Sequence, residues 1–226
     1  MRVFAACLAV LTCVACGEPG PPSAPPASPE VAAPVVAAVD PARVVQSRSE
    51  VPAGFEFADV AGRVAPVAQW GLGPAWTANP PTCAALGNPA VDEATVRGWS
   101  ASGPGAIVYA VAAAVSAGLD TGVLGDCERF AVAAGHTTGA VSIVDGPPIA
   151  DVPTVGLRAE TVTVVEGGTE TRSHAETFAA YPAGHVVYVT VVSDPGSGDS
   201  VLGPGFAARL LAGTTSAVRG VPVAGG

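Results

Sequence analysis

Three histidines are the residues of this sequence best suited to acid–base or metal chemistry near neutral pH: His136, His174 and His185. None of them stands at metal-ligand spacing from another histidine or from a cysteine. The sequence also contains no Gly-x-Ser-x-Gly elbow, Walker loop or His-Glu-x-x-His motif. Asp194 and Asp199 share a loop that lacks EF-hand spacing, so we expect a plain turn there. We therefore expect no metal, no cofactor and no catalytic residue.

Cysteine offers a different chemistry, because three of the five cysteines stand within the first sixteen residues. The run CVAC ends at Cys16 and resembles a bacterial lipobox, in which an apolar residue and then Gly or Ala precede the cysteine. Cys13 stands where the lipobox usually has Leu. That resemblance implies that Cys16 is joined through a thioether to diacylglycerol and carries acyl chains such as palmitate. Two acyl chains on one residue are enough for stable membrane anchoring.

The residues before Cys16 are typical of a signal peptide. Thr12 is the one polar residue between Val3 and Ala15, and this run follows Arg2. A membrane-spanning helix needs about 20 apolar residues, so the run is too short to be one. We expect a lipoprotein signal peptide over residues 1–15, with its single charge explained by a start codon further upstream. The alternative is an ordinary secretory signal, cut at Ala15, that leaves Cys16 as a free thiol.

Residues 16–40 are predicted to form a disordered tether. Seven prolines fall between Gly17 and Asp40, among alanines and serines. Such a segment buries too little apolar surface to fold and stays extended. We expect it to hold a single folded domain, residues 41–226, clear of the membrane.

Cys83 and Cys127 are the cysteines that remain in this expected domain. An even number of cysteines in an oxidising compartment predicts a disulfide bond. Within this expected domain there is no Cys-x-x-Cys motif, so zinc binding and thiol redox chemistry are not indicated there. The net charge of −9 makes the chain a poor candidate for binding nucleic acid, which depends on neutralising phosphates.

Alternating apolar and polar runs between glycine-rich turns predict a mostly antiparallel sheet. The turns at Gly103-Pro104-Gly105 and Gly167-Gly168 are the clearest, and the second has the signature of a two-residue primed turn. We expect 106–115 to be a central buried strand and the polar stretch Thr169 to Thr177 to lie near a sheet edge or rim. The expected strands are 54–62, 96–103, 106–115, 130–135, 139–145, 160–166, 169–177 and 185–192.

Short helical segments are predicted at 65–71, 81–89 and near 120–130, and a longer helix at 205–220. The longer helix places apolar residues on one face: Phe206, Ala207, Leu210, Leu211, Ala217 and Val218. Strands joined by tight turns, with a few helices packed on them, define an α+β domain.

The most distinctive stretch is WGLGPAWTANPPTCAALGNP, residues 70–89, which contains Trp70 and Trp76 next to Cys83. With Trp99 these tryptophans are candidate ligand-binding residues that form the apolar wall of a cleft. The alternative is that they fill a small core held by the disulfide bond.

That stretch and GWSASGPGAIVYAVAA, behind a proline-rich lipoprotein start, resemble a family of mycobacterial lipoproteins with a domain of unknown function. The family is similar, more distantly, to the extracellular sensor domain of PknH-type kinases. The closer resemblance covers about Val51 to the C-terminal helix. The resemblance to the kinase sensor domain implies an antiparallel sheet with flanking helices and a cleft for an unknown ligand. Kinase sensor domains carry two disulfides and follow a kinase, whereas this sequence offers one cysteine pair and no kinase.

Three functions follow as hypotheses. The first is a membrane-anchored, non-catalytic binding or sensor module for an envelope ligand. The second is a module that docks other envelope proteins through Thr169 to Thr177 or the sheet edge. The third is an envelope hydrolase, which needs a serine, a histidine and an acid to meet in space, with His174 or His185 as the histidine.

Overall fold

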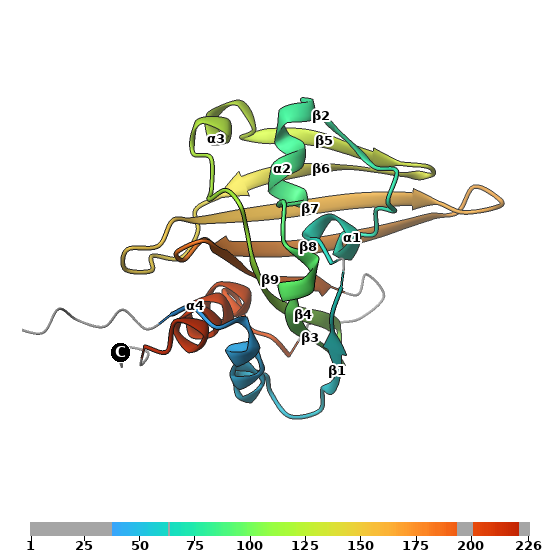
Figure 1. The fold of residues 1–226 in the computed structure, drawn as a ribbon. Helices are drawn as coiled ribbons and strands as arrows, with labels where there is room; N and C mark the ends of the chain where they lie inside the picture. The colour runs from blue at the N-terminus through green and yellow to red at the C-terminus, as the bar shows by residue number, and fades with distance from the viewer. Residues whose placement is uncertain (1–37, 63, 194–200, 222–226) are drawn as a thin grey trace, which may run out of the picture. The chain divides into compact units, whose positions relative to one another are not determined.

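The computed structural model describes residues 38–62, 64–193 and 201–221. All of them lie in one compact unit of the chain, Val36–Gly226. The described residues form a nine-stranded antiparallel sheet in the order β1-β3-β4-β9-β8-β7-β6-β5-β2 (Figure 1). The strands are β1 (Glu56–Val60), β2 (Thr77–Asn79), β3 (Arg97–Gly103), β4 (Ala106–Ala114), β5 (Arg129–Ala134), β6 (Thr137–Val144), β7 (Thr154–Val164), β8 (Glu170–Ala180) and β9 (His185–Ser193).

Helical segments in the described residues are short except at the two ends of the domain. They are η1 (Pro41–Glu50), α1 (Pro66–Gln69), η2 (Pro81–Cys83), α2 (Ala84–Gly87), η3 (Glu93–Thr95), α3 (Gly122–Asp126) and α4 (Phe206–Arg219). Within the described part of the chain, none of these helices has the length and apolar character needed to cross a membrane. The predicted α+β class, the antiparallel sheet and the C-terminal helix are confirmed.

Short turns join β3 to β4, β5 to β6 and β7 to β8, as the glycine pattern predicts. Pro104 and Gly105 form the two-residue loop between β3 and β4, and Gly105 has a φ of 76° that glycine adopts without steric cost. The loop between β7 and β8 is longer than the predicted two-residue turn. Val165 and Thr169 are joined by a backbone hydrogen bond of 2.9 Å, so Glu166 belongs to the loop together with the two glycines.

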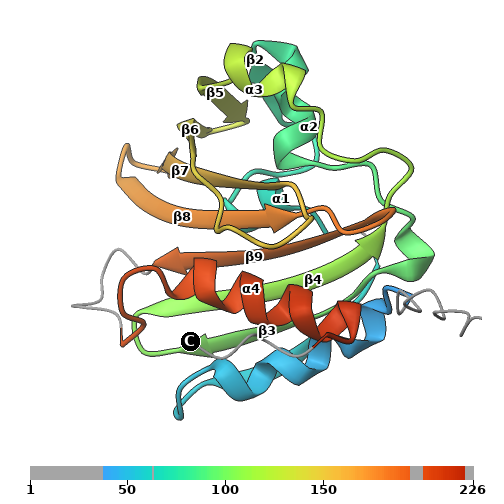
Figure 2. The same ribbon diagram turned by 90° about the vertical axis from the view of Figure 1, so that its left-hand side faces the viewer.

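Each face of the sheet carries its own core, because successive side chains in a strand point to opposite sides. In β4, Val111 and Ala113 belong to one core, whereas Val108, Ala110 and Ala112 belong to the other. We call the first side the disulfide face, since it includes Cys83 and Cys127. The second is the helix face, where Figure 2 shows α4 and η1 lying over β3, β4 and β9.

The helix face is covered by two helices from opposite ends of the domain. In α4 the predicted apolar stripe is buried at Ala207, Leu210, Leu211 and Val218, while Phe206 and Ala217 are half-buried. η1 is absent from the predicted elements, because its residues show no clear apolar period. Two local features do mark the start of η1. Asp40 is its N-cap, with a carboxylate that accepts a hydrogen bond from the Ala42 N–H at 2.9 Å, and a proline follows directly.

The prediction of a sheet edge for Thr169 to Thr177 is wrong, because β8 lies between β7 and β9 in the middle of the sheet. The polarity has another cause. Among the described residues β9 ends at Ser193, which pairs with His174, so within that part of the chain the first four residues of β8 pair with β7 alone. In addition, part of the helix face of β8 is not covered by α4, and exposed polar side chains such as His174 lie there.

Candidate functional site

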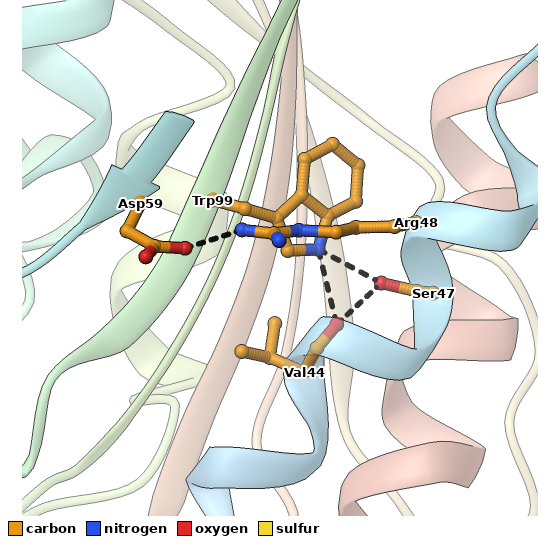
Figure 3. A network of polar contacts seen from close by, with 5 residues as sticks. All are labelled: Val44, Ser47, Arg48, Asp59 and Trp99. Atoms are coloured by element: carbon orange, nitrogen blue, oxygen red, sulfur yellow. Dashed lines mark hydrogen bonds and ion pairs between the residues drawn. The ribbon is translucent and has the colours of Figure 1, made fainter. Parts of the chain in front are cut away.

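Trp99 in β3 is completely buried beneath η1. Its indole N–H donates to the Val44 carbonyl at 3.0 Å and lies 3.3 Å from the Ser47 hydroxyl (Figure 3). The Ser47 hydroxyl also donates to the Val44 carbonyl at 2.8 Å. A buried indole N–H without a partner costs about 1–3 kcal/mol, so these contacts hold η1 on the sheet.

Side chains from β1 and η1 cover the outer side of Trp99 and form a small group of contacts at the surface. The ring of Phe57 meets the Trp99 ring edge-on, at 5.5 Å between centroids and 65° between planes. The Arg48 guanidinium lies 5.5 Å from the centre of the Phe57 ring and pairs with the Asp59 carboxylate. Because the Asp59 side chain is 90% exposed, this ion pair adds little stability, and the group chiefly keeps water from Trp99.

Trp70 follows α1 and is buried against the disulfide face, with 1% of its surface exposed. Its indole N–H donates to the Thr177 hydroxyl at 3.0 Å, and Thr177 and Thr190 share a hydrogen bond of 2.9 Å. The Trp70 carbonyl accepts a hydrogen bond from the Thr161 hydroxyl at 3.1 Å. Trp70 therefore joins the α1 segment to three neighbouring strands of the sheet.

The three tryptophans do not line one cleft. Trp70 and Trp99 fill cores on opposite faces of the sheet, and the sheet itself separates them. From the sequence the tryptophans could either line a cleft or fill a core. The structure shows Trp70 and Trp99 buried in cores. Trp76 is half-buried and is left as the candidate ligand-binding residue.

Beside Trp76 the surface has an open hollow of about 410 Å³, which we call the Trp76 hollow. Its lining is mostly apolar and comes from α1, the following loop and the end of α2. The lining residues are Ala65, Val67, Ala68, Leu72, Gly73, Pro74, Trp76 and Asn88. Asn88, the last of these, is the polar side chain of the set. This combination suits a small apolar group carried by a molecule with one polar end.

Gly87 in α2 lets the two nearby tryptophans converge behind the hollow. A Cβ atom at this position would lie 3.0 Å from the Trp70 ring and 3.3 Å from the Trp76 ring. Both distances are shorter than ordinary carbon contacts, so a side chain here would push the rings apart. The close sequence spacing of Trp70 and Trp76 thus does correspond to proximity in space.

The disulfide bond between Cys83 and Cys127 fixes this region to the far half of the sheet. Its S–S distance is 2.04 Å and the Cα atoms are 5.6 Å apart, which confirms the predicted bond. Both cysteines are completely buried in the core of the disulfide face. The bond joins the η2–α2 segment to the end of α3, so the wall of the Trp76 hollow is anchored covalently.

The three histidines lie apart from one another. His136 is in the turn between β5 and β6, and His185 begins β9, where its Nδ1 lies 2.9 Å from the Ala183 carbonyl oxygen. His174 lies between Glu160 of β7 and Ser193 of β9 on the helix face. Within residues 38–62, 64–193 and 201–221, no group of three or more His, Cys, Asp or Glu side chains could hold a metal ion.

The serine, histidine and acid required by the hydrolase hypothesis do therefore occur side by side. Among the described residues, however, His174 has no hydrogen bond to either Glu160 or Ser193. Cys16, Asp194 and Asp199 lie outside the described residues, so the lipidation site and the expected turn remain predictions.

The described residues thus form an antiparallel α+β domain with an apolar surface hollow beside Trp76. The model of the family Domain of unknown function (DUF5642) matches residues 40–219, so the chain belongs to this family. This match agrees with the resemblance that the tryptophan and cysteine motifs indicate. No curated protein sequence matches the chain.

Two solved mycobacterial structures are similar to this chain. The X-ray structure of an uncharacterized Rv0999 ortholog from Mycobacterium smegmatis matches with a TM-score of 0.58 and 23% identity, over 80% of this chain and 97% of that one. The extracellular domain of PknH from Mycobacterium tuberculosis gives a TM-score of 0.43 and 12% identity, over 81% and 93% of the two chains. The first likeness concerns the fold alone.

Proposed function

We propose that this chain is a lipid-anchored, non-catalytic binding or sensor module on the extracytoplasmic face of the cell membrane. In this proposal the Trp76 hollow receives the apolar part of a small amphipathic molecule of the cell envelope. The observation that carries the proposal is the hollow itself, with a half-buried tryptophan at its wall and a polar group, Asn88, among its lining residues.

Rigid support favours binding at this place. The Trp76 hollow is backed by Trp70, which is tied to the sheet by hydrogen bonds to Thr177 and from Thr161. Its α2 wall is held by the disulfide bond of Cys83. A preformed site loses little conformational entropy when a ligand binds, which favours affinity from a small contact area.

The extracytoplasmic location is supported by the disulfide bond, because such bonds persist in oxidising compartments and are rare in the cytosol. The lipobox-like run before Cys16 adds the anchor, and the proline-rich residues after it add the spacer. The membrane partner in this proposal is thus the lipid bilayer itself, reached through the diacylglycerol group.

Quenching by a brominated fatty acid tests the proposed site. The full chain in lipid nanodiscs is titrated with dibromostearate, whose bromine atoms quench tryptophan fluorescence at short range. We expect saturable quenching that is clearly smaller in Trp76→Phe, because Trp76 lines the hollow whereas Trp70 lies behind it. The matched control Trp99→Phe removes a tryptophan on the opposite face and should leave the quenching intact. Equal quenching in wild type and Trp76→Phe would contradict the proposal.

Cysteine substitutions test the proposed anchor. Cys16→Ala should release the protein from membranes, because the thioether to diacylglycerol cannot form. Cys13→Leu is the matched control: it restores the usual first residue of the lipobox and should leave anchoring intact or improve it. Membrane fractionation and the mass of the intact protein measure both effects. A Cys16→Ala protein that stays on membranes with no loss of acyl mass rules out this anchor.

A further inference from the structure

One row of side chains crosses five strands on the part of the helix face that lies beyond α4. Strand pairing places Ala131 opposite Ala140, Ala140 opposite Glu160, Glu160 opposite His174, and His174 opposite Ser193. Directly opposite residues in an antiparallel sheet have Cβ atoms about 5 Å apart, so the five side chains form a continuous line. The line begins with small apolar groups and ends with polar ones.

The side chains of this row differ in size, and the surface is hollow beside the smaller ones. Two shallow hollows of about 310 Å³ and 250 Å³ lie beside each other, and both include Glu160 and His174 in their lining. On β6 the small side chain of Ala140 leaves space in front of Glu160. We call this surface the Glu160 trough, with Thr138, Ala140, Glu160, Arg172, His174 and Ser193 as its main residues.

Glu160 and His174 are free to contact a ligand. Both are exposed, and neither has a hydrogen-bond or ion-pair partner among the described residues. Their charged neighbours differ in this respect: Arg158 contacts Glu176 at 3.0 Å and Arg172 contacts Glu170 at 3.0 Å. The trough therefore offers an unpaired carboxylate beside an imidazole, both ready to exchange hydrogen bonds.

The charges that line the trough indicate an uncharged ligand. Two arginines, Arg158 and Arg172, are balanced by two glutamates, Glu160 and Glu176. A polyanion would meet the glutamates and a polycation would meet the arginines, so neither is favoured by the local charge. Hydroxyl groups suit this set, because they donate to a carboxylate and also accept from an arginine or a histidine.

We propose that the Glu160 trough binds an uncharged, hydroxyl-rich oligosaccharide. The C–H face of a sugar ring would lie on Ala140 and the exposed Ala131. The hydroxyl groups along its edge would reach Glu160 and His174. This site lies on the opposite face of the sheet from the Trp76 hollow, so one small ligand cannot occupy both. The oligosaccharide proposal thus stands independently of the proposed function.

Titration calorimetry on the full chain in lipid nanodiscs tests this inference. The uncharged probes are maltoheptaose, mannohexaose and galactohexaose, and the charged probes are oligogalacturonate and chitosan oligomers. We expect saturable binding of at least one uncharged probe and weaker binding of the charged ones. Glu160→Ala should weaken that binding by about tenfold or more, since it removes a hydrogen-bond acceptor that carries a charge.

Two control variants separate the possible causes of a change. Glu166→Ala removes an equally exposed glutamate at the β7–β8 loop and should leave oligosaccharide binding unchanged. Trp76→Phe should also leave oligosaccharide binding unchanged, whereas it reduces the fatty-acid quenching. The inference is overturned if no uncharged probe binds, if only a charged probe binds, or if Glu160→Ala binds as well as Glu166→Ala. Because Glu160 is exposed, its removal leaves the core intact.

Discussion

At the scale of single residues, each buried tryptophan side chain makes its hydrogen bonds through one polar group, the indole N–H. The indole N–H of Trp99 bonds to Val44 in η1, and that of Trp70 bonds to Thr177 in β8. Each bond joins residues far apart in the chain, 55 and 107 positions respectively. A phenylalanine would fill most of the same volume but would have no hydrogen-bond donor. Its substitution therefore separates the contribution of the hydrogen bond from that of packing.

Trp99→Phe should lower the free energy of unfolding by about 2 kcal/mol or more, because it removes a buried hydrogen bond and leaves a small cavity. Trp76→Phe is the matched control. Trp76 is half-buried and has no hydrogen bond to another described residue that could be lost, so this change should cost less than about 1 kcal/mol. Urea unfolding followed by circular dichroism measures both. Equal costs for the two variants would show that the Trp99 contacts do not hold η1 on the sheet.

At the scale of elements, the packing of η1 on α4 depends on one glycine. A Cβ atom at Gly213 would lie 2.0 Å from a carboxylate oxygen of Glu50 and 2.6 Å from its carboxyl carbon. Burial raises the pKa of the Glu50 carboxyl, which agrees with a side chain pressed against the helix. Glycine is a poor helix former, so its presence inside α4 is explained by this close approach.

Gly213→Ala should push the Glu50 carboxylate aside, and because this exposed side chain can turn into solvent, the free energy of unfolding should change by less than about 1 kcal/mol. The same change made together with Glu50→Ala should be neutral or stabilising by up to about 1 kcal/mol, since alanine favours a helix and the clash has been removed. A double-mutant cycle from urea unfolding curves gives the interaction between the two sites. If Gly213→Ala costs the same in both backgrounds, contact with Glu50 is not the reason for the glycine.

At the scale of the whole domain, the disulfide bond is the covalent link between the α2 wall and the β5 half of the sheet. Cys83 and Cys127 are 44 positions apart and completely buried. Closing a loop of this size restricts the unfolded chain, which in the chain-entropy model stabilises the folded state by about 4 kcal/mol.

The double variant Cys83→Ala/Cys127→Ala should lose about 2–5 kcal/mol of unfolding free energy. It should still form the sheet, because the core of the helix face contains no cysteine. Urea midpoints are compared for the oxidised protein, the reduced protein and the double variant, and the last two should agree. A double variant as stable as the oxidised protein would mean that the bond adds no net stability.

The strands could be predicted because their signals are local. Residues 106–115 are apolar throughout and follow a glycine turn, and β4 occupies Ala106–Ala114. Three elements, β2, η1 and the single-turn η3, were not predicted, and their signals are weaker. β2 has three residues, too few to show alternation, and η1 has two buried residues, Val44 and Ser47, with no apolar stripe. The order of the strands was harder to predict. The polarity of β8 suggested an edge strand, whereas β8 lies in the middle of the sheet and is polar because part of its face is uncovered.

The sequence by itself determined the class of the fold, the turns between strands and the cysteine pair, because each depends on neighbours in the chain or on a count of residues. The tertiary structure decided the roles of the tryptophans and of Glu160, His174 and Ser193. Whether a tryptophan fills a core or lines a hollow depends on the segment that covers it, and that segment is distant in sequence. The row through Glu160 exists only because strand register places residues from separate strands opposite one another.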